Sequence, residues 1–247
     1  MFNTLLGFAL ILTRISAFFL VLPVFGWQAI PVRVKVAVTI ILSAYFGMMT
    51  PPAVDPVGVS TPLAIILLAE EAVYGLALGL IVMLLFSVVR LSGRIIEQQM
   101  GLTMARIVDP LTGEQGRPLS SLLEMIFILL FLSANGHHLF LAIISRSYQA
   151  FPPGTIPTVG ALVDGVVSTG SAMFVASLRL AAPMLAAFLI LMVVLALLAR
   201  LVPEMNILFI SMPLRVGLGL FMVAAFIPFV GGFVGEMADW MAKLLPL

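Results

Sequence analysis

Long hydrophobic stretches dominate this chain, and short polar or Pro/Gly-rich segments separate them. A helix needs about 20 mostly apolar residues to cross the hydrocarbon core of a membrane. Pro183 and Pro228 fall inside two of the stretches and predict kinks there, because proline removes a backbone donor. The pattern predicts an all-α membrane protein with six hydrophobic, partly kinked helices, at residues 4–22, 34–50, 63–89, 119–145, 172–199 and 214–235.

The fourth predicted helix contains a polar interruption, "NGHH", at residues 135–138. Asn135 and Gly136 are residue types found at helix ends, so we expect a break inside this span. Adjacent side chains on a helix point about 100° apart, whereas two ligands of one metal ion need an i, i+4 spacing. His137 and His138 therefore predict a helix break and no metal site.

Composition agrees with a membrane protein and excludes several classes of function. Hydrophobic residues make up 62% of the chain and charged residues 9%, with a mean hydropathy of +1.24, whereas soluble domains are about 25% charged. The net charge of +1 provides no field for nucleic acid, and the absence of cysteine excludes thiolate chemistry. Nucleotide-binding loops and serine-nucleophile motifs are also missing. We therefore predict a non-enzymatic protein without cofactor, metal or nucleic-acid partner.

The charged residues inside the predicted spans include Arg14, Glu70, Glu71 and Arg179. An arginine at the centre of a membrane helix costs about 2.5 to 3.5 kcal/mol on the insertion scale. One hypothesis is that these charges face neighbouring subunits or water. The other is a proton- or ion-coupled transporter of small solutes, with Glu70 and Glu71 as its midplane carboxylates.

Small residues also recur with helical spacing. Gly75 and Gly79 are four residues apart and so share one helix face, where they allow another backbone to approach closely. Packing within this chain and packing between subunits both fit that pattern. The motif Pro-x-Arg-Val occurs at 31–34 and again at 213–216, at the head of an apolar helix each time. Arg33 and Arg215 then face the positive end of the helix dipole and should have an anionic neighbour, either lipid phosphate or a carboxylate.

Residues 90–122 form the most informative polar segment. Residues 90–107 are amphipathic, and residues 108–121 contain Asp-Pro, two glycines and Arg-Pro, which favour turns over helix. Met100 and Met104 are flexible apolar side chains that suit either core filling or a pore-lining seal. A Gly/Pro loop fits an ordinary connection or a movable gate. The candidate gating residues are Arg106, Asp109, Pro110, Gly113, Gly116 and Pro118.

Several longer motifs together resemble one family, the FliR-like flagellar export-gate subunits of type III secretion. They are "PVFG" at 23–26 with "IPVRVK" at 30–35, "GLALGL" at 75–80, "DPLTGEQGRPLSS" at 109–121 leading into "LFLSANGHHLFLAIISRSY" at 130–148, and "RLVPEMNILFISMPLRVGLGL" at 200–220. The equivalent subunits of virulence type III secretion systems share the first and last patterns. The loop and the NGHH segment therefore favour the flagellar branch.

The resemblance implies a single export-gate subunit over residues 1–247 of the bacterial inner membrane, located in the flagellar basal body. It implies FliP and FliQ as partners in a conduit for unfolded flagellar proteins, with FlhB and FlhA adjoining. Residues 1–160 would resemble FliP and include a pore-plugging loop at 106–122. Residues 161–247 would form a FliQ-like helical hairpin with an amphipathic C-terminal end.

The same resemblance implies a role for the polar segment 200–213, as the bend between two arms at 178–201 and 214–234. Pro203 and Pro213 would cap the arms, and Glu204 and Asn206 would satisfy the freed backbone groups. These four residues and Arg215 are the predicted bend and subunit interface.

Overall fold

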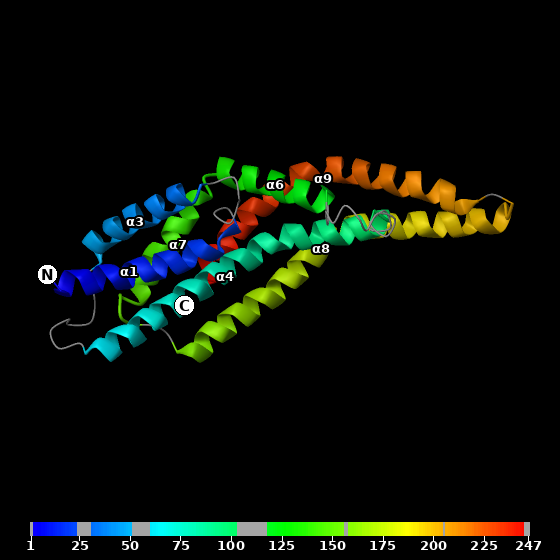
Figure 1. Ribbon diagram of the computed structural model, residues 1–247. Coiled ribbons are helices and arrows are strands. Elements are labelled where there is room, and N and C mark those ends of the chain that lie inside the picture. Colours follow the sequence, from blue (N-terminus) through cyan, green and yellow to red (C-terminus); the bar gives the residue numbers. More distant parts are fainter. Residues whose placement is uncertain are drawn as a thin grey trace, which may run out of the picture. The chain divides into compact units, whose positions relative to one another are not determined.

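The structure is a computed structural model that describes residues 2–23, 31–50, 60–102, 118–155, 158–204 and 206–244. These residues form seven α-helices joined by turns (Figure 1), which confirms the all-α prediction. The helices divide into two compact units. Unit 1 comprises residues 1–86, 132–172 and 236–247, and unit 2 comprises residues 87–131 and 173–235.

Unit 1 contains α1 (Phe2–Val21), α3 (Val32–Met49), α7 (His137–Ala150) and the first parts of α4 (Thr61–Met100) and α8 (Val159–Leu201). Helices α1 and α3 pack against each other. The buried side chains of α1 recur every three or four residues, as expected for a helix with one face in a core. Aromatic rings extend that core, with ring centroids 5.6 Å apart for Phe46 and Tyr148 and 6.1 Å apart for Phe86 and Phe140.

Helices α1 and α4 approach closely at two glycines, and this approach needs glycine. A Cβ atom added at Gly75 would overlap the carbonyl oxygen of Arg14, and one added at Gly79 would lie 2.9 Å from the carbonyl oxygen of Phe18. Gly75 and Gly79 therefore serve packing within the chain, one of the two uses predicted for this pair.

Unit 2 contains the end of α4, most of α6 (Pro118–Ser133), the second part of α8 and most of α9 (Ile207–Leu244). The buried face of α6 includes Leu119, Leu123 and Phe127, spaced four residues apart. Helix α6 lies so close to α4 that a Cβ atom at Gly93 would be 2.9 Å from the Cα atom of Ser120. Backbone approach at a glycine thus recurs in both units.

The predicted spans and the observed helices differ in length. The third span is part of a 40-residue helix, α4, which includes Glu70 and Glu71 and continues to Met100. The amphipathic residues 90–100 are therefore the end of α4. The polar residues of this segment share one face, so they are compatible with a helix. Helix α4 ends at Met100, and the next residue, Gly101, has φ +77°.

The break predicted inside the fourth span is confirmed. Helix α6 ends at Ser133 and α7 begins at His137, with a bend of 72° between them. Asn135 adopts the left-handed region at φ 59°, which asparagine tolerates better than most residues.

The bend between α8 and α9 is shorter than the predicted 200–213. Helix α8 ends at Leu201 and α9 begins at Ile207, so Pro213 lies inside α9 and does not cap it. Helix α9 starts about two turns earlier than expected, and the Asn206 carbonyl oxygen accepts a bond from the Phe209 N–H at 3.1 Å at its beginning. Pro213 has no backbone N–H, a property that suits the start of a helix. It does not mark the start of α9, because that helix begins at Ile207.

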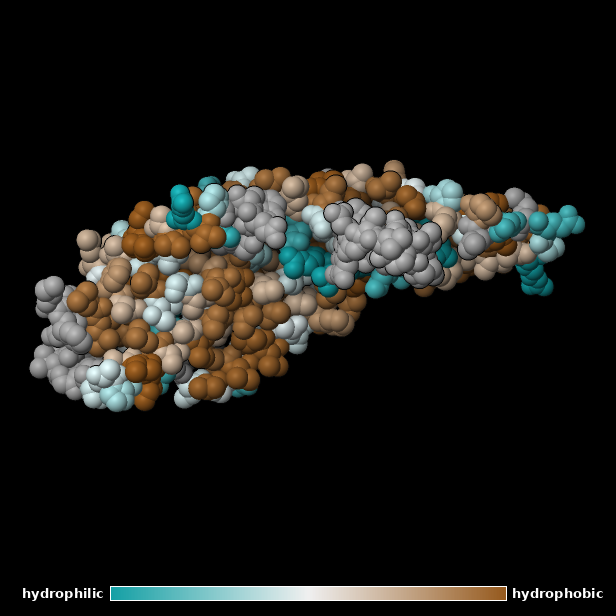
Figure 2. Space-filling model, viewed as in Figure 1, coloured by the Kyte–Doolittle hydropathy of each residue, from teal (hydrophilic) through white to brown (hydrophobic). Residues whose placement is uncertain are grey.

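Much apolar surface stays outside the core. Within the described residues, three helices are long and apolar enough to cross a membrane, α3, α4 and α8, or four if the bent pair α6 and α7 counts as one span. In the most apolar 18-residue stretch of each helix, the buried share is 22% for α8, 11% for α3 and 61% for α4. Figure 2 shows hydrophobic residues, in brown, over much of the face it presents. Such surface requires lipid or another protein to cover it.

Candidate functional site

Unit 1 contains a buried ion pair between Arg14 of α1 and Glu71 of α4. The Arg14 Nε atom lies 2.5 Å from Glu71 Oε2, and Nη2 donates to Glu71 Oε1 at 2.9 Å. The two side chains are 2% and 0% exposed. This is the bidentate geometry in which a guanidinium binds a carboxylate most strongly.

The remaining polar atoms of the pair bind backbone groups. Arg14 Nη1 donates to the carbonyl oxygens of Ser147, at 3.3 Å, and Phe151, at 2.9 Å. Glu71 Oε1 accepts a bond from the Gly154 N–H at 2.7 Å. The pair thus connects α1, α4, α7 and the turn that follows α7.

Two tyrosine rings complete the surroundings of Arg14. Its guanidinium carbon lies 4.6 Å from the ring centroid of Tyr74 and 4.4 Å from that of Tyr148. The Tyr148 hydroxyl donates to the carbonyl oxygen of Ile11 at 3.2 Å. We call Arg14, Glu71, Tyr74 and Tyr148 the charge cluster. The hydrogen bonds and cation–π contacts of the cluster replace water around the buried charge of Arg14. Because its members belong to α1, α4 and α7, the cluster also joins these three helices.

The charge cluster revises one expectation for the charges in the spans. Arg14 and Glu71 were expected to face a neighbouring subunit or water, but the structure buries them inside unit 1 and pairs them with each other. Glu70, the neighbour of Glu71, is half-buried, and Arg179 is exposed on α8. The expectation of an interface position stays a prediction for Glu70 and Arg179.

A second cluster lies in unit 2, where α4 meets the start of α6. Buried Glu97 accepts bonds from the N–H groups of Leu119, at 2.8 Å, and Ser120, at 3.1 Å, through Oε1. Its Oε2 atom accepts the Ser120 hydroxyl at 3.1 Å. A carboxylate at the positive end of a helix satisfies donors that the helix leaves free. We call Glu97, Leu119 and Ser120 the loop base, because residues 103–117 connect the two helices that it joins.

A partly exposed ion pair lies farther along the same two helices. Arg90 Nε donates to Glu124 Oε2 at 2.9 Å, and Arg90 Nη2 contacts Glu124 Oε1. The side chains are 38% and 19% exposed. It therefore adds a second connection between α4 and α6, weaker than a buried one because water screens it.

Most of the residues predicted for the gate lie outside the part of the chain that the structure describes. Arg106, Asp109, Pro110, Gly113, Gly116 and Met104 lie outside the described residues, and Pro118 is the first residue of α6. The Met100 side chain is 1% exposed and packs on α9, where a Cβ atom at Gly219 would lie 2.5 Å from its sulfur. In the isolated chain Met100 thus fills the core of unit 2, and its pore-lining role stays a prediction.

The residues predicted for the bend are close to one another in sequence but differ in environment. Pro203, Glu204 and Asn206 are exposed at the turn, whereas Arg215 is half-buried within α9. No group of three metal-ligating side chains occurs among the residues that were described.

Two contacts between α4 and α6 were not predicted from the sequence. Glu97 caps α6 from a position 22 residues before Leu119, and Arg90 pairs with Glu124 over 34 residues. Local capping patterns search a few residues around a helix start, so they cannot find a cap supplied by another helix. The one available hint was that α6 starts with Pro-Leu-Ser-Ser and has no acidic residue in its first turn.

Comparison with known proteins places these features in a family. The family described as "Bacterial export proteins, family 1" matches residues 5–241. The flagellar biosynthetic protein FliR of Escherichia coli (strain K12) is 29% identical over 234 residues, which cover 95% of this chain and 89% of that protein. FliR of Bacillus subtilis (strain 168) is 29% identical over 222 residues, covering 88% and 84%.

A relative from another system is similar over nearly the same region. The Yop proteins translocation protein T of Yersinia pestis is 27% identical over 216 residues, which cover 85% of this chain and 82% of that protein. Since the family match extends over almost the whole chain, across both units, the protein belongs to the bacterial export proteins, family 1.

Proposed function

We propose that this chain is a subunit of the flagellar type III export gate, which forms with FliP and FliQ a conduit for unfolded flagellar proteins across the bacterial inner membrane. FlhB and FlhA are the adjoining partners, and the complex belongs to the flagellar basal body. The observation that carries this proposal is the similarity to FliR proteins over nearly the whole chain, 95% of it in one case. The flagellar branch is preferred to the virulence branch because of the loop at 109–121 and the NGHH motif at 135–138.

The surface of α8 supports a subunit with protein neighbours. Phe174, Val175 and Leu178 are 55%, 49% and 39% exposed, and Arg179 is exposed beside them. Apolar side chains alone would suit lipid, but a charged residue within them is costly in hydrocarbon, by about 2.5 to 3.5 kcal/mol near the centre of a span. A neighbouring subunit with a carboxylate or free carbonyl groups would compensate the arginine.

The loop base supports a plug in the segment that connects α4 to α6. Residues 118–122 of the predicted plug at 106–122 belong to α6, where Leu119 and Ser120 are buried, so the proposal is kept for residues 106–117. Glu97 joins the end of α4 to the start of α6, so both ends of the connecting segment are fixed. A Gly/Pro-rich segment between two fixed helix ends can move without rearranging the helices. In this proposal Arg106, Asp109 and Gly113 belong to the part that obstructs the conduit.

The alternative of a solute transporter is less well supported. A proton- or ion-coupled transporter needs a carboxylate that gains and loses its bound ion during each cycle. Both oxygens of Glu71 are occupied by Arg14, and Oε1 also accepts the Gly154 N–H. Glu71 is therefore better suited to joining helices than to carrying an ion, and a non-enzymatic export subunit fits the chain better.

Co-purification from a flagellated host tests the partnership. We expect tagged protein to elute with FliP and FliQ as one large complex. Substitution Arg179→Glu should greatly reduce the recovered partners, whereas Arg200→Glu, at an exposed arginine near the end of the same helix, should not. A stable monomer that binds a solute and recovers no partner would contradict the proposal.

Deletion of Thr112–Gly116 tests the plug. In an assembled complex this deletion should let ions pass, measured as conductance across a planar bilayer. A variant in which the same five positions are replaced by a Gly/Ser segment of equal length separates loop length from loop sequence. If the deletion variant assembles and its conductance equals that of the intact complex, the plug is disproved while the subunit assignment stands.

A further inference from the structure

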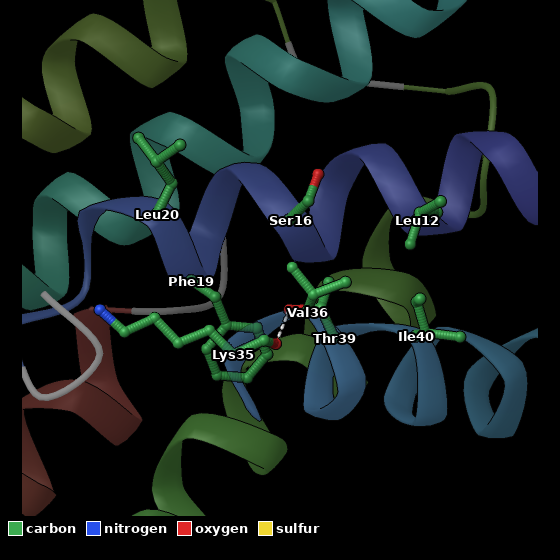
Figure 3. Close-up of a pocket in the computed structure, with 8 residues that line it drawn as sticks. All are labelled: Leu12, Ser16, Phe19, Leu20, Lys35, Val36, Thr39 and Ile40. Atoms are coloured by element: carbon green, nitrogen blue, oxygen red, sulfur yellow. Dashed lines mark hydrogen bonds between the residues drawn. The ribbon is translucent and has the colours of Figure 1, made fainter. Parts of the chain in front are cut away.

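The exposed apolar surface of α3 has its charges at one end. Arg33 and Lys35 lie in the first turn of α3, and the rest of the helix contains no charged residue. Figure 3 shows Lys35 at one end of the groove between α1 and α3, with Leu12 and Ile40 toward the other end. Basic residues at the end of a membrane helix can reach the lipid headgroups. Lipid alone is therefore a suitable cover for α3.

Helix α8 has a charge in the middle of its exposed apolar surface. Arg179 is exposed, with 20 residues of the helix before it and 22 after it. Val163 and Val167 are exposed apolar residues on one side of Arg179 along the helix, and Leu189 and Leu201 are exposed on the other side. Arg179 makes no hydrogen bond or ion pair with any residue that the structure describes. That part of the chain therefore does not compensate its charge.

The exposed apolar surface of α8 is too long for one bilayer to cover. Val163 and Leu201 are 38 positions apart, which is about 57 Å at 1.5 Å per residue. A hydrocarbon core about 30 Å thick contains only about 39 Å of a helix that is tilted by 40°. A bilayer centred on Arg179 would bury the charge, and a bilayer shifted along the helix would leave one apolar side of Arg179 outside. Protein is therefore needed beside Arg179 to cover that surface.

The backbone at Arg179 is also unsuited to hydrocarbon. Pro183 lies inside α8, one turn after Arg179, and has no backbone N–H. The carbonyl oxygen of Arg179 therefore lacks the donor that an α-helix normally supplies from that position. Arg179, Ala182 and Pro183 are all exposed. Because a carbonyl group without a donor is costly among acyl chains, the backbone and the guanidinium both favour a polar protein environment at this point of α8.

We propose that the surface of α8 around Arg179 is the docking site for an apolar helix of a neighbouring subunit that presents a carboxylate to the guanidinium. This inference rests on the export-gate function proposed above and specifies the chemistry of the partner. Exposed Phe174 and Leu178 contact apolar side chains of that helix, and an aspartate or glutamate lies opposite Arg179. A carboxylate is preferred to carbonyl groups because it neutralises the charge and binds a guanidinium in bidentate geometry. Glu71 does the same for Arg14 inside unit 1.

Site-specific photo-crosslinking in the assembled complex tests the docking site. A benzoylphenylalanine at Leu178, which is exposed beside Arg179, is activated in lipid nanodiscs, and the adduct is identified by mass spectrometry. We expect an adduct with a peptide of a neighbouring subunit that has an aspartate or glutamate within one helical turn of the linked residue. Arg179→Glu in the same protein should lower this adduct at least about ten-fold, because it opposes two carboxylates. Arg200→Glu, a matched change near the end of the same helix, should leave the adduct unchanged.

A charge exchange tests the contact itself. Replacing the partner's acidic residue by arginine in the Arg179→Glu background should restore the adduct to at least about half of its original yield. The inference is overturned by an adduct with lipid alone or with this chain, by a linked peptide without an acidic residue, or by an exchange that restores nothing. In each of these cases the subunit assignment stands if the unsubstituted chain recovers its partners. If the unsubstituted chain recovers no partner, the proposed function itself fails.

Discussion

The charge cluster and the loop base use carboxylates from the same helix in opposite ways. Glu71 of α4 binds a guanidinium that is buried with it, so each charge needs the other. Glu97, near the other end of α4, accepts backbone N–H groups and a hydroxyl at the start of α6. The first arrangement fixes three helices of unit 1, and the second fixes only the two helix ends that border residues 103–117. The buried ion pair therefore joins helices in the core of unit 1, whereas Glu97 joins the two helix ends at the base of the loop in unit 2.

Removing one charge of the buried pair should have the largest effect. Substitution Glu71→Gln leaves Arg14 buried without a counter-charge, and breaking a buried pair in this way costs about 3 to 5 kcal/mol. Glu70→Gln is a matched control at the next position of the same helix, where the side chain is half-buried, and should change stability by no more than about 0.5 kcal/mol. Unfolding by SDS in mixed micelles, followed by circular dichroism, measures both. Equal losses in the two variants would refute a special role for the pair.

Adding a methyl group at the α1–α4 contact should have the next largest effect. Substitution Gly75→Ala places a Cβ atom against the backbone of Arg14, which must move away, at a cost of about 1 to 3 kcal/mol. Gly217→Ala adds the same atom to helix α9 where nothing lies within 4 Å, and should stabilise the protein by about 0.5 to 1 kcal/mol. The same SDS titration compares them. A loss in both variants would mean that the glycines matter for another reason than close approach.

Substitution at the loop base should have the smallest effect on global stability and a clear local one. Glu97→Ala removes the acceptor at the start of α6, and the loss of a helix cap typically costs about 0.5 to 2 kcal/mol. Hydrogen exchange at the amides of Leu119 and Ser120 should accelerate at least about ten-fold, since a bond worth about 1.4 kcal/mol is lost. Glu124→Ala, which breaks the partly exposed pair with Arg90, should leave those two amides unchanged. Equal exchange rates of these two amides in all variants would show that Glu97 does not stabilise the start of α6.

Local patterns along the chain predicted more of the fold than of the site. The helical class, the break at Asn135 and Gly136 and the close contact at Gly75 depend on residues within a few positions of one another, and the sequence displays them directly. The ends of the helices were harder to predict from the sequence. The helix α4 continues beyond its apolar part to Met100, because an amphipathic pattern continues a helix as well as an apolar one does.

The features that the sequence did not predict depend mostly on contacts between distant segments. Arg14 and Glu71 were both identified as unusual, yet nothing in either local sequence pairs residues 57 positions apart. Glu97 lies in the segment 90–107, which was predicted only to be amphipathic, and its partners belong to another helix. Pro213 was given a capping role by the bend that the family resemblance implies, whereas α9 begins before it, at Ile207. Side-chain partners are set by how helices pack, and a single sequence specifies that packing only indirectly.

The sequence separation within the charge cluster has a consequence for synthesis. The ribosome adds Arg14 57 residues before Glu71, and the acceptor carbonyls of Ser147 and Phe151 follow Arg14 by 133 and 137 residues. At about 5 to 20 residues per second, Glu71 follows after roughly 3 to 11 seconds. During that interval α1 carries a guanidinium without this counter-ion, which disfavours its partition into the bilayer. Helix α1 therefore cannot complete its buried polar contacts until α7 and the turn after it have been synthesised.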